Sequence, residues 1–206
     1  MTKPVVVMGA GGHAKVCIEI LRETRPVAAC IGNAHGGSDC LGVPVIEGDE
    51  QLSAFRLQGI AHAFVAIGSN SVRARMGAFV AEQGFELVNA VSSSAVVSPS
   101  VRLGAGVAVM AGAVINAATD IADLVVINTG ATVDHDCVLG RAVHIAPQCA
   151  LAGSVTVGDG SMLGVGAIVL PGVRIGANVV VGAGAVVRED VPDGATVVGV
   201  PARARS

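Results

Sequence analysis

The chain has 206 residues, enough for one average domain or two small ones, and for a core that needs neither disulfides nor a structural metal. Its 13 Lys and Arg against 16 Asp and Glu leave a net charge of −3, so no overall basic excess favours binding to nucleic acid or to an anionic membrane. The apolar residues, 52% of the chain, are not gathered into spans of membrane length, and the start lacks the pattern of a signal peptide, which predicts a cytoplasmic protein.

The composition changes near residue 90, because all four Phe precede that position and Trp and Tyr are absent. From there on Gly and small or branched aliphatic residues dominate, as expected for a core that repeats one cross-section many times. We therefore expect one domain at 1–90 and a second at 91–206 that ends in a short tail. The five cysteines are odd in number and lack C-x-x-C spacing, which argues against a disulfide framework or a zinc ribbon.

The first domain begins with the pattern of a strand, a glycine turn and a helix. An apolar run at 5–8 precedes a G-x-G-x-x-A turn from Gly9 to Ala14, which exposes backbone N–H groups and a helix N-terminus to a phosphate. The motif is weak on its own. An NAD-binding domain places an acidic residue after its second strand, here 27–31, but Gly32-Asn33 stands there and disfavours NAD.

A further strand at 63–67 leads into a second glycine turn and a helix. Gly68 opens that turn and Arg73 follows one helical turn later, which predicts an anion-binding segment. The alternative is an ordinary strand-to-helix turn with a solvated arginine. Residues 85–90 predict the last strand of the domain.

A six-residue period governs the second domain. In frames of six that start at Val91, the first position of all 17 hexads holds a branched aliphatic residue and the fifth position a small or β-branched one. Each strand is expected to run from a fifth position to the next first position, with both of these side chains pointing inward. Second positions often hold Gly, as at Gly104, Gly140 and Gly158, which suggests turn or left-handed backbone there. The pattern predicts a parallel β-helix with three hexads in each triangular coil.

Only two histidines lie in the predicted β-helix, and both are outside its core. His135 is third in its hexad, at a corner, and His144 is sixth, at the outward middle of a strand. Because that corner lies opposite the face that carries His144, the two imidazoles of one chain point in opposite directions. One site can use both only if they come from different subunits, which predicts an oligomer such as a threefold ring. The alternative is two solvated histidines.

The residues after His135 indicate acid–base chemistry. Asp136 follows it directly, and a carboxylate on one ring nitrogen raises the basicity of the other, as a general base requires. Cys137 occupies an inward fifth position, which disfavours covalent catalysis. Metal catalysis of the γ-carbonic-anhydrase kind needs a third histidine in the β-helix, so no metal is expected. The remaining histidines precede residue 90: His13, His35 and His62.

The whole chain resembles the hexapeptide-repeat N-acetyltransferases that act on nucleotide sugars, of the bacillosamine- and perosamine-pathway type, with sialic acid O-acetyltransferases as relatives. The segments that carry the resemblance are GAGGHAK at 9–15, FVAIGSNSVR at 64–73, INTGATVDHDC at 127–137, HIAP at 144–147 and GVPA at 199–202. The resemblance implies a small Rossmann-like α/β domain followed by a left-handed parallel β-helix. It also implies a homotrimeric enzyme that uses acetyl-CoA.

The resemblance also implies roles for particular residues. His135 would be the general base and Asp136 would raise its basicity, while His144 and the backbone at Val165 and Ala183 would contact acetyl-CoA. The residues implied to hold the sugar nucleotide are Gly11, Gly12, His13, Asn33, Gly68, Asn70 and Arg73. The reaction would be direct attack of a sugar amine, bound at a subunit interface, on the thioester of acetyl-CoA. Some relatives have an acidic pair near the base in place of Gly32-Asn33, so guanine and uracil both stay open.

Two other functions remain as alternatives. O-acetylation of a sialic acid or another sugar hydroxyl would use the same fold and the same base, and an assay with amino and hydroxyl acceptors separates the two. A non-catalytic sugar-nucleotide-binding protein would carry both histidines incidentally, and two off-core histidines at opposed positions disfavour it.

Overall fold

The computed structural model describes residues 2–33 and 38–205, so His35 lies outside the described residues. The chain forms two compact units, Met1–Ser93 and Ser94–Ser206. No helix among the described residues has the length and apolarity needed to cross a membrane.

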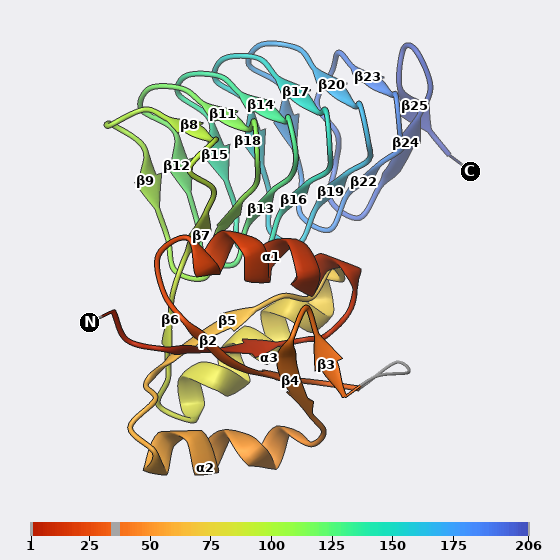
Figure 1. Cartoon of the computed structure of the whole chain (residues 1–206). Helices are drawn as coiled ribbons and strands as arrows, with labels where there is room; N and C mark the ends of the chain where they lie inside the picture. The colour runs from red at the N-terminus through yellow and green to blue at the C-terminus, as the bar shows by residue number, and fades with distance from the viewer. Residues whose placement is uncertain (1, 34–37, 206) are drawn as a thin grey trace. The chain divides into compact units, whose positions relative to one another are not determined.

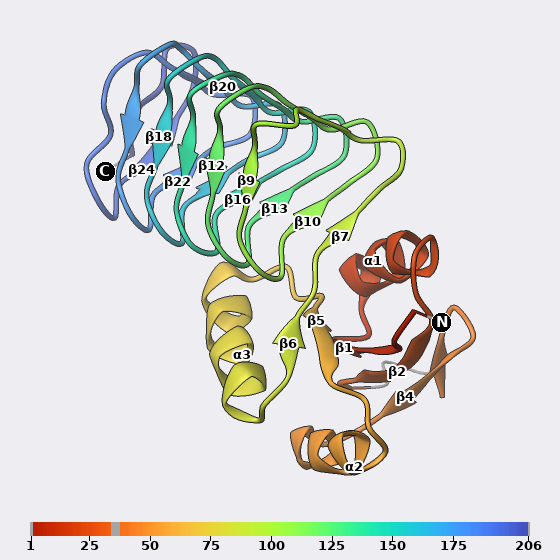
Figure 2. The same cartoon turned by 90° about the vertical axis from the view of Figure 1, so that its left-hand side faces the viewer.

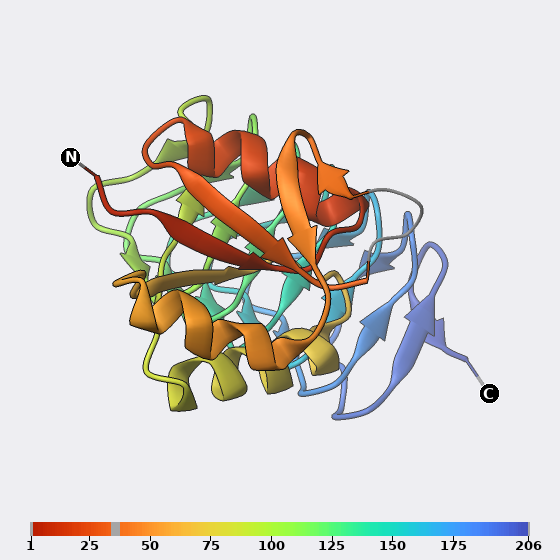
Figure 3. The same ribbon diagram turned by 60° about the horizontal axis from the view of Figure 1, so that its bottom comes forward.

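The first unit is a Rossmann-like α/β domain with one sheet of strand order β3-β4-β2-β1-β5-β6. Its strands are β1 Val5–Met8, β2 Val27–Ile31, β3 Asp39–Cys40, β4 Val43–Ile46, β5 His62–Val65 and β6 Glu86–Leu87. Its helices are α1 Gly12–Arg22, η1 Asp49–Gln51 (a 3₁₀ turn), α2 Leu52–Leu57 and α3 Asn70–Glu82. Helix α1 covers one face of the sheet, and α2 and α3 cover the other (Figures 1 and 3).

The central strand explains why this unit folds around its sheet. All four residues of β1 are buried, and a continuous apolar run is typical of a parallel strand that has both faces covered. Strands β1, β2, β4 and β5 are parallel, so their carboxyl ends meet at one edge. The two glycine turns and the segment that enters η1 all begin at this edge, and together they can surround a ligand.

Two expectations for this unit need correction. The strand predicted at 85–90 was too long, because the edge strand β6 pairs with β5 only at Glu86–Leu87 before β7 begins at Ala90. The sequence pattern also did not predict the β3–β4 hairpin or η1. That hairpin turns at Gly42, whose φ is 71°, and it contributes an antiparallel pair to an otherwise parallel sheet.

The second unit is a left-handed parallel β-helix whose coils form one continuous stack, running from green at β9 to blue at β24 (Figure 2). Two-residue strands recur every six residues, each made of a sixth and a first hexad position. Their bounds are β7 Ala90–Val91, which ends the first unit, then β8 Val96–Val97, β9 Arg102–Leu103, β10 Ala108–Val109, β11 Val114–Ile115, β12 Asp120–Ile121, β13 Val126–Ile127, β14 Thr132–Val133, β15 Val138–Leu139, β16 His144–Ile145, β17 Ala150–Leu151, β18 Thr156–Val157, β19 Met162–Leu163, β20 Ile168–Val169, β21 Arg174–Ile175, β22 Val180–Val181 and β23 Val186–Val187. The period then breaks, and β24 Thr196–Val198 pairs in antiparallel fashion with β25 Arg203–Ala204.

The β-helix has three faces. We call the strands β10, β13, β16, β19, β22 and β24 face 1, the strands β8, β11, β14, β17, β20 and β23 face 2, and the strands β9, β12, β15, β18 and β21 face 3. Stacked strands pair in register 18 residues apart, as Val133 pairs with Leu151. First-position residues such as Val133, Leu139 and Ile145 are at most 1% exposed, so they form the core.

The second-position glycines serve a different purpose from the one predicted. Every sixth residue from Gly106 to Gly184, the fourth position of each hexad, has positive φ, whereas the second-position glycines do not. A Cβ at Gly158 would lie 2.6 Å from the backbone N of Ala177, and a Cβ at Gly164 would lie 2.6 Å from that of Ala183. These glycines are therefore needed for close stacking of one coil on the next, and the left-handed turns lie two residues later.

Candidate active site

His135 lies at the corner between β14 on face 2 and β15 on face 3. Its Nδ1 is 2.8 Å from Oδ2 of Asp136, and the two side chains are 57% and 60% exposed. Asp136 can turn back toward the ring because its own backbone is left-handed, with φ 59°. The corner therefore presents an accessible imidazole that is held by a carboxylate at one nitrogen.

Two carboxylates set the charge at this corner. The hydrogen bond with Asp136 is the main reason why the pKa of His135 is raised, and the negative charge of Asp134 adds to it. Asp134 Oδ1 accepts the backbone N–H of His135 at 2.8 Å and the Nδ2–H of Asn116 at 2.9 Å. These hydrogen bonds lower the pKa of Asp134 and keep it ionised. The imidazole is thus a strengthened base that accepts a proton only where the pH leaves it neutral.

A cavity of about 550 Å³ in the first unit and one of about 460 Å³ beside His135 are lined by predicted site residues. The second is lined by Asp134, His135, Ala152, Gly153, Ser154, Pro171 and Gly172. All of these residues come from one corner of three successive coils. An acceptor group that enters this corner pocket lies beside the ring of His135.

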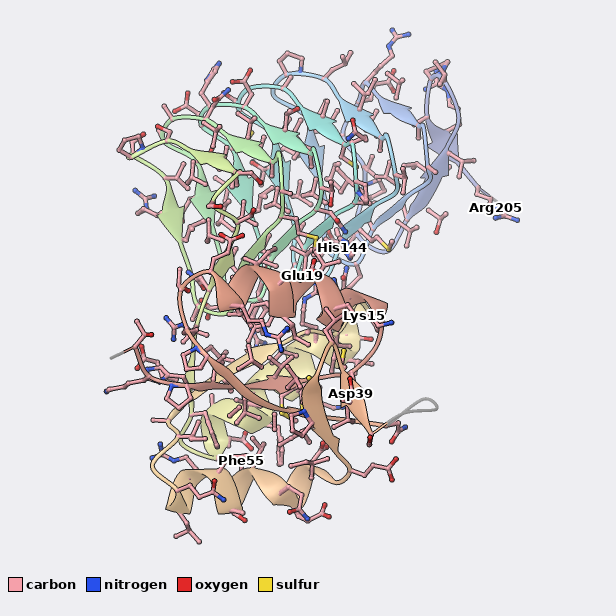
Figure 4. The ribbon with its side chains drawn as sticks, in the orientation of Figure 1. Lys15, Glu19, Asp39, Phe55, His144 and Arg205 are labelled. Carbon is pink, nitrogen blue, oxygen red and sulfur yellow. The ribbon has the colours of Figure 1, made fainter. Side chains whose placement is uncertain are left out.

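His144 occupies the outward position of β16 on face 1, between Val126 and Met162 on the neighbouring strands. Figure 4 labels it on the coil that carries β16. Its side chain is only 8% exposed, and Nε2 lies 3.2 Å from Nδ2 of Asn128. The alternative of a solvated histidine is therefore wrong for His144, although its strand position is the outward one.

The remaining positions implied to contact acetyl-CoA lie at another corner of the same β-helix. Val165 and Ala183 follow face 1 strands and precede face 2 strands one coil apart, and both are exposed. The backbone N–H of Gly184 donates to the carbonyl of Val165 at 2.8 Å, which ties these two turns together. His135 stands at the corner opposite face 1. Within one chain His135 and His144 are therefore on opposite sides of the prism, while Val165 and Ala183 stand at a different corner from His135.

Cys137 points into the core beside this corner. It is fully buried, its Sγ donates to the carbonyl of Ala152 at 3.3 Å, and burial raises the pKa of its thiol. A thiol that is buried and protonated is a poor nucleophile. Within residues 2–33 and 38–205, no group of three or more His, Cys, Asp or Glu could hold a metal ion.

The cavity of the first unit opens at the carboxyl edge of its sheet. Five of the residues implied to hold a sugar nucleotide line it: Gly11, Gly12, His13, Asn33 and Gly68. It is also lined by residues that the sequence did not single out, among them Asp49, Val72 and Met76. Asp49 was missed because it enters the edge after β4, a strand that the sequence pattern did not predict. The Gly11 to His13 amides at the start of α1 make this cavity suitable for an anionic ligand.

Arg73 and Asn70 are not among the residues that line this cavity. Arg73 is 1% exposed, so the alternative of a solvated arginine is wrong. Its Nη1 donates to the carbonyls of Ile67 and Gly68, both at 3.0 Å, and its Nη2 donates to Oδ1 of Asn70 at 2.9 Å. Burial lowers the pKa of Arg73 to about 10, which leaves it cationic at neutral pH. The guanidinium therefore supports the Gly68 turn from behind.

Two family models match the chain. The PglD N-terminal domain matches residues 4–78, and the bacterial transferase hexapeptide model (six repeats) matches residues 154–189. The first covers strands β1 to β5 and the cavity of the first unit, and the second covers later coils of the β-helix.

Solved structures match the full length of the chain. PerB from Caulobacter crescentus, in complex with CoA and GDP-perosamine, is 54% identical over 100% of this chain and 99% of that one, with a TM-score of 0.96. The acetyltransferase domain of PglB from Neisseria gonorrhoeae is 38% identical over 99% of this chain and 100% of that one, with a TM-score of 0.94. A second structure of that domain, in complex with acetyl coenzyme A, is 36% identical over 100% of both chains, with a TM-score of 0.93.

Proposed function

The chain belongs to the hexapeptide-repeat N-acetyltransferases of nucleotide-activated amino sugars, and we propose that it transfers acetyl from acetyl-CoA to the amino group of GDP-perosamine or a close analogue. The observation that carries the proposal is the His135–Asp136 pair beside an open corner pocket, within a chain 54% identical to an enzyme that binds both CoA and GDP-perosamine. We expect the reaction to take place in the cytoplasm, where acetyl-CoA is available.

In the proposed mechanism His135 acts as general base. The sugar amine attacks the thioester carbonyl while Nε2 of His135 takes a proton from the amine nitrogen, and Nδ1 stays on Asp136. The C–S bond then breaks, a new C–N amide bond remains, and the proton passes to the departing CoA sulfur. Backbone N–H groups stabilise the oxyanion of the tetrahedral intermediate. The buried Cys137 needs no part in this sequence, because no acyl-enzyme forms.

The proposed assembly is a homotrimer in which His135 of one subunit and His144 of the next share a site. Their opposed positions require a neighbour, and a closed ring gives every subunit two contact surfaces. The outward residues support two contact surfaces, because those on face 2 and on the later strands of face 1 are uncharged and several are exposed, among them Met162, Ile168 and Val180. Those on face 3 include the Arg102–Asp120 ion pair and Arg174, as expected for a face left in water.

The proposed base of the nucleotide is guanine, because Asp49 lines the cavity of the first unit. A carboxylate only accepts hydrogen bonds, and guanine offers it the adjacent donors N1–H and N2–H₂. Uracil presents a single N–H between two carbonyl oxygens, which a carboxylate would repel. The cavity therefore favours GDP over UDP.

The function is tested by following release of the CoA thiol with three acceptors: GDP-perosamine, a UDP-linked 4-amino sugar and sialic acid. We expect turnover with the first and an N-acetylated product. Turnover only with sialic acid would make the enzyme an O-acetyltransferase. Absence of turnover with every acceptor, together with tight nucleotide binding, would favour the non-catalytic alternative.

The choice of base is tested by calorimetric titration with GDP and UDP. We expect the wild-type protein to bind GDP about 10-fold more tightly or better, and Asp49→Ala to remove most of that preference, since a bidentate contact to a base discriminates by ~1–3 kcal/mol. Glu82→Ala, which removes an exposed carboxylate at the end of α3, should change neither constant. Equal binding of the two nucleotides by the wild type would refute the guanine assignment.

A further inference from the structure

Gly153 stands out among the corners of the β-helix. It is the third residue of its hexad, and every other third position from Ser93 to Glu189 holds a residue with a side chain. Its backbone does not explain the glycine, because Gly153 is not among the residues with positive φ. An alanine could therefore adopt this backbone without strain.

The space above Gly153 explains why this position holds a glycine. A Cβ built on Gly153 would lie 2.6 Å from both Cε1 and Nε2 of His135, and 3.2 Å from its Nδ1. Contacts of that length do not occur, so the ring would have to move. The imidazole thus lies across the bare backbone of the next coil, 18 residues along the chain. Both residues line the corner pocket.

We propose that Gly153 is a positioning residue for His135: its bare backbone is the surface on which the ring rests with Nδ1 on Asp136 and Nε2 beside the pocket. This inference rests on the proposed role of His135. A side chain at 153 would tilt the ring and lengthen its hydrogen bond to Asp136, now 2.8 Å. The base would then be both misaligned with the incoming amine and weakened.

The charged groups that act on the ring are Asp134 and Asp136, both from its own corner. The coil on one side brings Ala117 and the coil on the other brings Gly153 and Ser154, none of which titrates. The hydrogen bond with Asp136 is the larger cause of the raised pKa of His135. Displacing the ring should therefore lower this pKa toward its ordinary value.

The test is Gly153→Ala. We expect kcat to fall about 10- to 100-fold, as for misplacement of a reacting group by about 1 Å, and the acid limb of the pH–rate profile to move to lower pH. Ala111→Ser, which adds an atom at an exposed third position of another corner, should leave both unchanged. In a His135→Ala background, Gly153→Ala should cause no further loss of kcat, whereas a purely structural role would add its own loss.

NMR titration of the His135 imidazole gives a readout that does not depend on turnover. We expect a lower His135 pKa in Gly153→Ala than in the wild type, at an unchanged melting temperature. An unchanged pKa and pH profile would overturn the inference. If His135→Ala instead retained near-normal turnover, the general-base role would fail, and the NMR result would still decide whether Gly153 positions the ring.

Discussion

At the scale of single residues, the corner at His135 combines exposure with a strong local negative charge. Exposure lets an acceptor approach the ring, and the two carboxylates raise its pKa. A raised pKa strengthens the base and also keeps it protonated up to a higher pH. Activity should therefore rise as the pH passes upward through the pKa of His135, because only the neutral ring accepts a proton.

Asp136→Asn tests this balance. It removes the carboxylate that contributes most to the raised pKa, so the pKa of His135 should fall. Since the neutral form then persists at lower pH, the acid limb of kcat/KM should move to lower pH, while the maximal rate falls because the base is weaker. The measurement is a pH–rate profile of the variant beside that of the wild type.

His135→Ala is the control for that profile. It should lower turnover by about two to four orders of magnitude and remove the acid limb that His135 causes. A modest loss with an unchanged profile would instead assign His135 to substrate binding and exclude it as the base.

The adjacency of His135 and Asp136 is visible in the sequence, and so is the hexad position that places both at a corner. Asp49 is not visible in this way, because it stands beside no recognisable motif and reaches the cavity only because it follows strand β4. For Arg73 the sequence suggested a contact that the fold does not show. Its spacing from Gly68 pointed to a ligand contact, and only the fold shows that its guanidinium lies behind the turn.

At the scale of elements, the six-residue period could be predicted because inward side chains must repeat with the coil. The left-handed turns could not, since residues such as Ala118 and Leu124 adopt positive φ without belonging to a type that favours it. Their conformation is imposed by the coils on either side. The β3–β4 hairpin was missed for a related reason, because its two-residue first strand is too short to show a pattern.

The Gly68 turn offers a test at this scale. Arg73→Met removes a buried cation that donates to two turn carbonyls, so unfolding free energy should fall by about 1–3 kcal/mol. The KM for the sugar nucleotide should rise about 10-fold with little change in the KM for acetyl-CoA, because only the turn is disturbed. Arg75→Met, on the exposed side of the same helix, should change stability by less than about 0.5 kcal/mol. Equal effects from both variants would contradict the role given to Arg73.

At the scale of the whole molecule, the three-sided geometry of the β-helix keeps the two histidines of one chain apart. His135 stands at the corner between faces 2 and 3, and His144 stands on face 1. No rotation of side chains brings them together within one chain. A site that uses both must be completed by a second subunit.

Subunit complementation tests whether the two histidines act in a site shared between subunits. His135→Ala and His144→Ala chains, carrying different tags, are co-expressed, and the mixed trimers are isolated through both tags. Each variant alone should be weakly active. In every trimer that carries both tags one junction in three joins an intact His135 to an intact His144, so we predict recovery of about a third of wild-type activity. Activity no higher than the average of the two separate variants would contradict a site shared between subunits.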